Sequence, residues 1–135
     1  MNAVDTNILI YVNDPRDSVK QGVAISLVSA LTEGILLWQV ACEYLAPSRK
    51  LESLGYNRAQ AYQYIRDLQQ IWYTALLIWS VINRAEDLMS RFNLSHWDSM
   101  IIAACLEVNV QTLYTEDLGY SSINGLVIVN PFKVP

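Results

Sequence analysis

The sequence predicts an α/β protein in which a mostly parallel central sheet lies between two layers of helices. Short apolar runs that are typical of buried strands alternate with longer segments whose apolar residues recur every three or four positions. Strands that alternate with helices form parallel sheets with helices on both faces, which gives a three-layer α/β/α sandwich. A third observation is positional, because four acidic residues stand at or near the ends of these segments.

One domain is expected over residues 1–135. The chain has 135 residues, of which 53% are hydrophobic and 16% are charged, and this composition suits one compact core. No linker, repeat or low-complexity segment stands out, and the apolar runs are too short to span a membrane. Met1 leads almost directly into a strand-like run rather than into a signal peptide. The expectation is a cytoplasmic protein that does not act in a membrane.

The first half of the chain contains two predicted strands and three predicted helices. Asp5 stands in the N-cap region of the first helix, and Gly34 follows the second helix as a C′ glycine would. Pro47 is expected to kink the third helix, which carries Glu43. In order, these elements are a strand at 2–5, helices at 6–12 and 18–33, a strand at 35–38 and a helix at 39–55.

The second half contains three predicted helices and three predicted strands. Ser95 and Asp98 have the spacing of a capping box at the start of the last helix. The body of this helix is apolar nearly all round, which predicts that it is buried in the centre of the fold. In order, these elements are a helix at 57–72, a strand at 74–79, helices at 83–92 and 95–108, and strands at 110–115 and 126–132.

Four acidic residues are the candidate site. Each alone has an ordinary explanation as a helix cap, a turn residue or a solvated helix face. Together they are harder to explain, because three are embedded in apolar segments and uncompensated buried carboxylates are costly. The carboxyl ends of parallel strands share one sheet edge, and the first turns of helices can face it. The four are Asp5 in AVDTNILIY, Glu43 in WQVACEYL, Asp98 in LSHWDSMIIAA and Asp117 in LYTEDLGY.

A set of four carboxylates at one sheet edge predicts a metal-dependent site that cuts phosphodiester bonds. Mg²⁺ prefers carboxylate oxygen, and the small polar residues beside the acids, such as Thr6 and Thr115, can orient ligands or metal-bound water. His96 is the only histidine, which argues against a zinc site built on histidines. Cys42 and Cys105 are each expected to be small buried hydrophobes rather than ligands.

Charge and aromatic residues give weaker indications about the substrate. A net charge of −4 and a pI near 4.8 disfavour a passive nucleic-acid binder, whereas bound cations would supply positive charge at a scissile phosphate. Arg49 and Lys50 either hold RNA phosphate or form a solvated face. Trp97 either stacks on a base or packs against the protein. The aromatic residues over 51–73 suggest a protein interface.

The segments VDTNILIY, ACEYL, SHWDSMIIAA and LYTEDLGYSSINGLVIVNPF resemble the PIN-domain family, and more narrowly the VapC-type toxin ribonucleases of type II toxin–antitoxin pairs. The resemblance covers essentially the whole chain. It implies an α/β/α sandwich that cleaves RNA with Mg²⁺ or Mn²⁺, a homodimer, and an antitoxin protein that fills the cleft. The family's acidic quartet maps onto Asp5, Glu43, Asp98 and Asp117, and its supporting positions onto Thr6, Asn7, Thr115 and Glu116.

Other classes of protein fit the sequence less well. A catalytically degenerate protein of the same fold would act only by binding a protein partner, and Pro47, close after Glu43, is the one feature that favours it. The chain lacks the pair of acids that a phosphoryl-accepting receiver domain has after its first strand. It also has Asn7 where a haloacid dehalogenase needs its second Asp. The absence of a glycine-rich phosphate loop argues against nucleotide-binding enzymes.

Overall fold

The computed structural model describes residues 1–133. In chain order the elements are β1 (Asn2–Val4), α1 (Thr6–Val12), α2 (Ser18–Ala30), β2 (Gly34–Leu37), α3 (Trp38–Leu45), the 3₁₀ helix η1 (Pro47–Leu54), α4 (Arg58–Ile71), β3 (Tyr73–Ala75), α5 (Trp79–Arg91), α6 (His96–Glu107), β4 (Thr112–Tyr114), β5 (Ser122–Ile123) and β6 (Leu126–Val129). The strands form one sheet in the order β3-β2-β1-β4-β6-β5. Every pair is parallel except β5 with β6, which confirms the predicted fold class.

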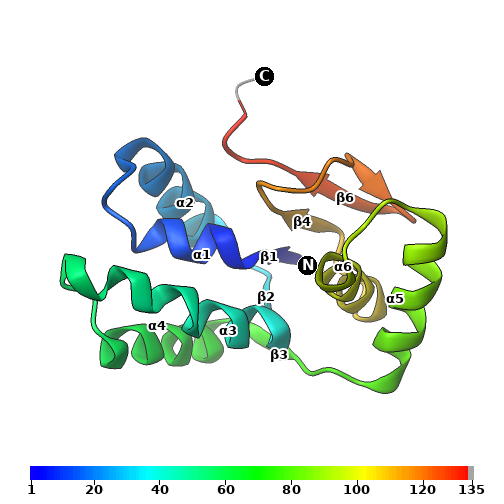
Figure 1. Cartoon of the computed structure of the whole chain (residues 1–135), viewed down its shortest axis with the longest axis horizontal. Helices are drawn as coiled ribbons and strands as arrows, with labels where there is room; N and C mark the ends of the chain where they lie inside the picture. The colour runs from blue at the N-terminus through cyan, green and yellow to red at the C-terminus, as the bar shows by residue number, and fades with distance from the viewer. Residues whose placement is uncertain (134–135) are drawn as a thin grey trace.

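Two groups of helices cover opposite faces of the sheet, as Figure 1 shows. The chain moves in one direction from β1 to β2 to β3, and its crossovers place α1 to α4 on one face. It then returns past β1 to β4, and that crossover places α5 and α6 on the other face. Parallel crossovers are almost always right-handed, so reversing the direction of travel changes the face that the helices cover.

The strand order reverses between β1 and β4, at the centre of the sheet. Ala3 pairs with Leu113 there, and the Asp5 N–H donates to the Tyr114 carbonyl oxygen at 2.8 Å. Open α/β sheets bind ligands outside the carboxyl ends of their strands at such a reversal. The fold therefore directs the segments after β1 and β4 to one place.

Helix α6 lies in the centre of the core, as its apolar sequence predicts. Its residues from Ser99 to Cys105 are all buried, and it packs against α5, β2 and β6. The Ser95 hydroxyl oxygen accepts the Asp98 N–H at 3.1 Å, so this half of the predicted capping box is present. A rigid central helix thus fixes the backbone that carries Asp98.

The structure corrects three boundaries in the first half. Gly34 is the first residue of β2 rather than a C′ residue, and a Cβ there would overlap the indole of Trp72. Trp38 begins α3 instead of ending the strand. The predicted kinked helix is two elements, because α3 ends at Leu45 and Pro47 is the first residue of η1. A missing N–H is tolerated at the first position of a helix, so Pro47 follows α3 instead of bending it.

The second half and the cysteines are corrected as well. The strand predicted over 74–79 is only β3, and α5 begins at Trp79, four residues earlier than expected. The two-residue strand β5 was not predicted. Cys42 is exposed, contrary to expectation, whereas Cys105 is buried. Within residues 1–133, no helix is long and apolar enough to cross a membrane.

Candidate active site

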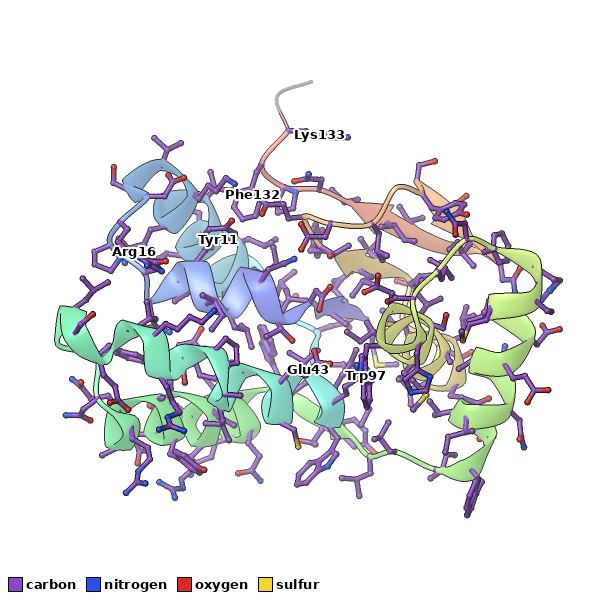
Figure 2. All side chains as sticks on the ribbon, viewed as in Figure 1. Tyr11, Arg16, Glu43, Trp97, Phe132 and Lys133 are labelled. Atoms are coloured by element: carbon purple, nitrogen blue, oxygen red, sulfur yellow. The ribbon has the colours of Figure 1, made fainter. Side chains whose placement is uncertain are left out.

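One cleft of about 500 Å³ opens at the carboxyl ends of β1 and β4. All four predicted acids line it, although they come from four separate segments of the chain. In Figure 2, Glu43 and Trp97 lie at the centre of the molecule, between the two groups of helices. The polar and aromatic residues that line this cleft are Asp5, Thr6, Asn7, Tyr11, Asp14, Arg16, Glu43, Lys50, Trp97, Asp98 and Asp117.

Asp5 follows β1 directly and caps α1, so backbone geometry fixes its carboxylate. The carboxylate accepts the Thr6 N–H at 2.7 Å on one oxygen and the Thr115 hydroxyl at 2.8 Å on the other. Burial raises the pKa of Asp5 from 3.8 to about 6, and the nearby charges of Asp98 and Glu43 add to the rise, although the two hydrogen bonds oppose it. A carboxylate with such a pKa favours the approach of a cation.

Glu43 lies in the second turn of α3 rather than in the predicted first turn. The Thr6 hydroxyl donates to Glu43 Oε2 at 2.9 Å, and Gln39 Nε2 donates to Oε1 at 2.8 Å. Gln39 is one helical turn before Glu43, and this i, i+4 spacing is the signal by which sequence reasoning could have found it. The glutamate side chain is therefore held from both sides by uncharged donors.

Asp98 and Asp117 complete the group. Asp98 is in the first turn of α6, and its carboxylate has no hydrogen-bond donor among the described residues. Asn7 Nδ2 donates to Asp117 Oδ2 at 2.9 Å. Three of the predicted supporting residues, Thr6, Asn7 and Thr115, thus each hydrogen-bond a carboxylate of the quartet.

None of these four carboxylates forms an ion pair with a Lys or Arg of residues 1–133. The Asn7 Oδ1 and Gln39 Oε1 atoms are buried and have no hydrogen-bond partner. Over the same residues, no three acidic, His or Cys side chains converge closely enough to hold one ion as they stand. The four carboxylates therefore carry negative charge that no ion pair within residues 1–133 balances.

Two neighbouring acids behave differently. Asp14, which sequence reasoning missed, accepts Arg16 Nε at 2.9 Å and Nη2 at 2.8 Å, and these bonds hold its pKa below its usual range. Glu116 accepts both Lys20 and the Tyr11 hydroxyl. Burial acts to raise its pKa, but these two donors lower it overall. Glu116 does not line the cleft, so it supports the loop before Asp117 instead of facing the quartet.

The predicted substrate-binding residues divide. Lys50 and Trp97 line the cleft, but Arg49 does not. Arg16, which was not predicted, also lines it. Trp97 is 60% exposed, so the packing interpretation of this residue does not hold. The His96 ring contacts the Trp97 indole edge-to-face, with the centroids 4.6 Å apart.

A scan against family models matches the PIN domain over residues 3–126. This match covers most of the chain, and the chain belongs to the PIN domain family. The resemblance seen in the sequence is thereby confirmed at the level of the family. Comparison with curated proteins gives no match.

Three solved structures share this fold. The first is a toxin–antitoxin complex from Klebsiella pneumoniae, with a TM-score of 0.70, 17% identity, and 99% of this chain and 100% of that chain covered. The second is the VapC20 toxin of Mycobacterium tuberculosis, described as cleaving the sarcin–ricin loop, with a TM-score of 0.66, 13% identity, and 84% of this chain and 87% of that chain covered. The third is VapBC2 from Rickettsia felis, bound to a promoter DNA fragment, with a TM-score of 0.68, 14% identity, and 96% of this chain and 97% of that chain covered. At these identities the likeness shows the fold.

Proposed function

We propose that this protein is a metal-dependent endoribonuclease that hydrolyses RNA phosphodiester bonds, and that it is the toxin of a toxin–antitoxin pair. The observation that carries the proposal is that four carboxylates from four segments line one cleft and form no ion pair with a Lys or Arg of residues 1–133. The family match and the toxins among the solved structures support it. Action on RNA is consistent with the cytoplasm as its location.

The residues of the cleft fit a divalent cation. Oxygen is the ligand atom that Mg²⁺ and Mn²⁺ prefer, and the quartet supplies carboxylate oxygens whose mutual repulsion a cation would relieve. The buried Asn7 Oδ1 atom, which has no partner, is a further oxygen acceptor in the same place. Asp5 and Asp98 are the residues proposed to hold the metal directly, with Glu43 and Asp117 as further ligands or as holders of the attacking water. The metal, when bound, would polarise the scissile phosphate and lower the pKa of a water.

The protein's own residues then orient the reacting groups. Thr6 and Thr115 fix the oxygens of Glu43 and Asp5, so those carboxylates keep their directions when substrate enters. Glu43, which two neutral donors hold, would accept a proton from a water in the cleft. Hydrolysis in this way leaves a 5′-phosphate and a 3′-hydroxyl.

The test is cleavage of end-labelled RNA by purified protein free of any antitoxin, with Mg²⁺ or Mn²⁺ and with a chelator as the control. The expected result is metal-dependent cutting with 5′-phosphate ends. Absence of cutting on a broad set of RNAs, together with absence of Mn²⁺ binding, would contradict the proposal. The degenerate-site alternative has lost its support, because Pro47 lies beyond the end of α3 and Glu43 keeps its place in the cleft.

An antitoxin partner and a homodimer belong to the same proposal. One of the similar structures is described as a toxin–antitoxin complex, which supports the antitoxin partner. The aromatic residues over 51–73 divide, because Trp72 is buried and the Tyr56 hydroxyl bonds that of Tyr44, whereas Tyr62 and Tyr73 are exposed. The exposed apolar surface continues from Tyr73 through residues 76–79. Light scattering on the purified protein would test the dimer, and a monomer at every concentration would count against it.

A further inference from the structure

The cleft continues beyond the carboxylates in both directions. It is lined by Trp97 of α6 as well as by Lys50 of η1 and by Arg16, which follows α1. In Figure 1 the segment that follows α3 lies on the side of α1 and α2, away from α6. Helix α1 has seven residues and is therefore roughly 10 Å long, so Arg16 and Asp5 stand a helix length apart. Figure 2 shows Arg16 well away from Trp97, with Glu43 close to Trp97. The carboxylates thus lie between an aromatic end and a basic end.

Hydrogen bonds from Gln39 connect the aromatic end of the cleft to the carboxylate of Glu43. Gln39 Nε2 donates both to Glu43 Oε1, at 2.8 Å, and to the Trp97 carbonyl oxygen, at 3.2 Å. The backbone of Trp97 is therefore positioned by the same amide that positions Glu43. The indole, in contrast, remains 60% exposed beside the cleft. Leaving a large apolar ring in water forgoes the hydrophobic stabilisation of its burial, so an exposed and anchored indole favours a ligand that covers it.

The basic end supplies the positive charge of Lys50, together with Arg16, whose charge is balanced by Asp14. Lys50 is exposed and forms no ion pair with any residue of the described range. Arg16 is held by Asp14 through Nε and Nη2, so its guanidinium group is fixed at the edge of the cleft. A backbone phosphate is the ligand that suits a lysine and an ordered arginine in this position.

We infer that the cleft binds an unpaired RNA segment with one base stacked on Trp97 and the backbone phosphates on the other side of the cut held by Lys50 and Arg16. Stacking needs a base whose face is free, which a duplex does not present, so the base that lies on Trp97 must be unpaired. This inference rests on the proposed nuclease function. Trp97 would select among substrates by their unpaired bases, whereas Lys50 and Arg16 would contribute affinity that does not depend on sequence.

The experiment compares single-turnover cleavage, in Mn²⁺, of a short single-stranded RNA that the wild type cuts. Trp97→Ala is expected to raise the half-saturating protein concentration about tenfold, which lies within the usual range for loss of one stacked base, and Trp97→Phe to retain most of the binding. Tyr62→Ala is the matched control, because Tyr62 is an exposed aromatic residue outside the cleft. Lys50→Gln is expected to lower the slope of log affinity against log salt by about one.

An abasic substitution separates stacking from a structural effect. Moved along the RNA, it is expected to weaken wild-type cleavage about tenfold at one position and to have no effect there on Trp97→Ala. Cleavage by Trp97→Ala that equals wild type, or an equal loss in Tyr62→Ala, would overturn the stacking role and leave the nuclease function intact. Absence of any cleavage by the wild type would instead remove the proposed function, and the inference with it.

Discussion

Acidic residues in and beside the cleft fall into two groups that differ in how their charge is balanced. Asp14 and Glu116 are each bonded to a cation, Arg16 and Lys20 respectively. The quartet has only neutral donors, such as Thr6, Thr115 and Asn7. Neutral donors orient a carboxylate without cancelling its charge, so the protein leaves the quartet available to a cation that it does not itself provide. The difference separates acids that are paired with a cation of the protein from acids whose charge is left unbalanced.

The largest expected effect comes from removing an unbalanced charge and comparing it with a balanced one. Asp98→Asn should lower the cleavage rate roughly a thousandfold, because a metal ligand supplies several kcal/mol of transition-state stabilisation. Asp14→Asn should lower it less than tenfold. Cleavage of end-labelled RNA in Mn²⁺ measures both. Equal losses in the two variants would erase the distinction between the groups.

Asp5 should show that an unbalanced carboxylate costs stability when no metal is bound. Its folded-state pKa of about 6 exceeds the unfolded value of 3.8, so the folded protein holds this proton more tightly than the unfolded chain. Stability from this group is then fully present below about pH 4 and is lost as pH rises through 6, a loss of about 3 kcal/mol.

Asp5→Asn should abolish this decline and stabilise the metal-free protein at pH 7, while it abolishes cleavage. Urea unfolding between pH 4 and pH 8, in the presence of a chelator, measures the effect. The same dependence of stability on pH in wild type and variant would show that the carboxylate of Asp5 is not strained by its burial.

Metal binding should stabilise the folded protein through the quartet alone. At a Mn²⁺ concentration about a hundredfold above the dissociation constant, linkage gives about 2.7 kcal/mol, which raises the melting temperature by several degrees. Asp14→Asn should keep this rise, and Asp98→Asn should lose most of it. Thermal unfolding with and without Mn²⁺ tests this, and an equal rise in Asp98→Asn would place the metal elsewhere.

The smallest effect is expected at the balanced pair of Lys20 and Glu116. Lys20→Met should destabilise the protein only slightly, because the pair is partly exposed to solvent, although Glu116 would lose its cation. Glu116→Gln should cost a similar amount, and the double variant less than the sum of the two. Chemical unfolding of the four proteins gives the coupling energy. A loss of cleavage in Glu116→Gln as large as that in Asp98→Asn would mean that Glu116 belongs to the site.

The strongest local signals in the sequence predicted the fold class and the membership of the cleft. Asp5, Glu43 and Asp98 were found because acids inside apolar segments need an explanation, and Asp117 was found because it follows a predicted strand. The apolar body of α6 was likewise enough to predict its central position. These are properties of single segments, so the order of apolar and acidic residues along the chain is enough to predict them.

Properties that depend on tertiary neighbours were not predictable in the same way. Glu116 has the same local sequence signal as Asp117, and only the packing of α2 turns it toward Lys20. Cys42 is exposed because it lies on the outer side of α3, although its neighbours in the sequence are apolar. The lack of room for a side chain at Gly34 comes from the indole of Trp72, which lies 38 positions further along the chain.

The pairing of β1 with β4 has a consequence for biosynthesis. Thr115 bonds Asp5 across 110 positions of sequence, and the last acid of the quartet comes two residues later. A ribosome-bound chain therefore exposes Asp5, Glu43 and Asp98 before the strand that completes their cleft exists. If the proposed function is correct, translation of this protein proceeds without an assembled nuclease beside the ribosome's own RNA until residue 117 has emerged.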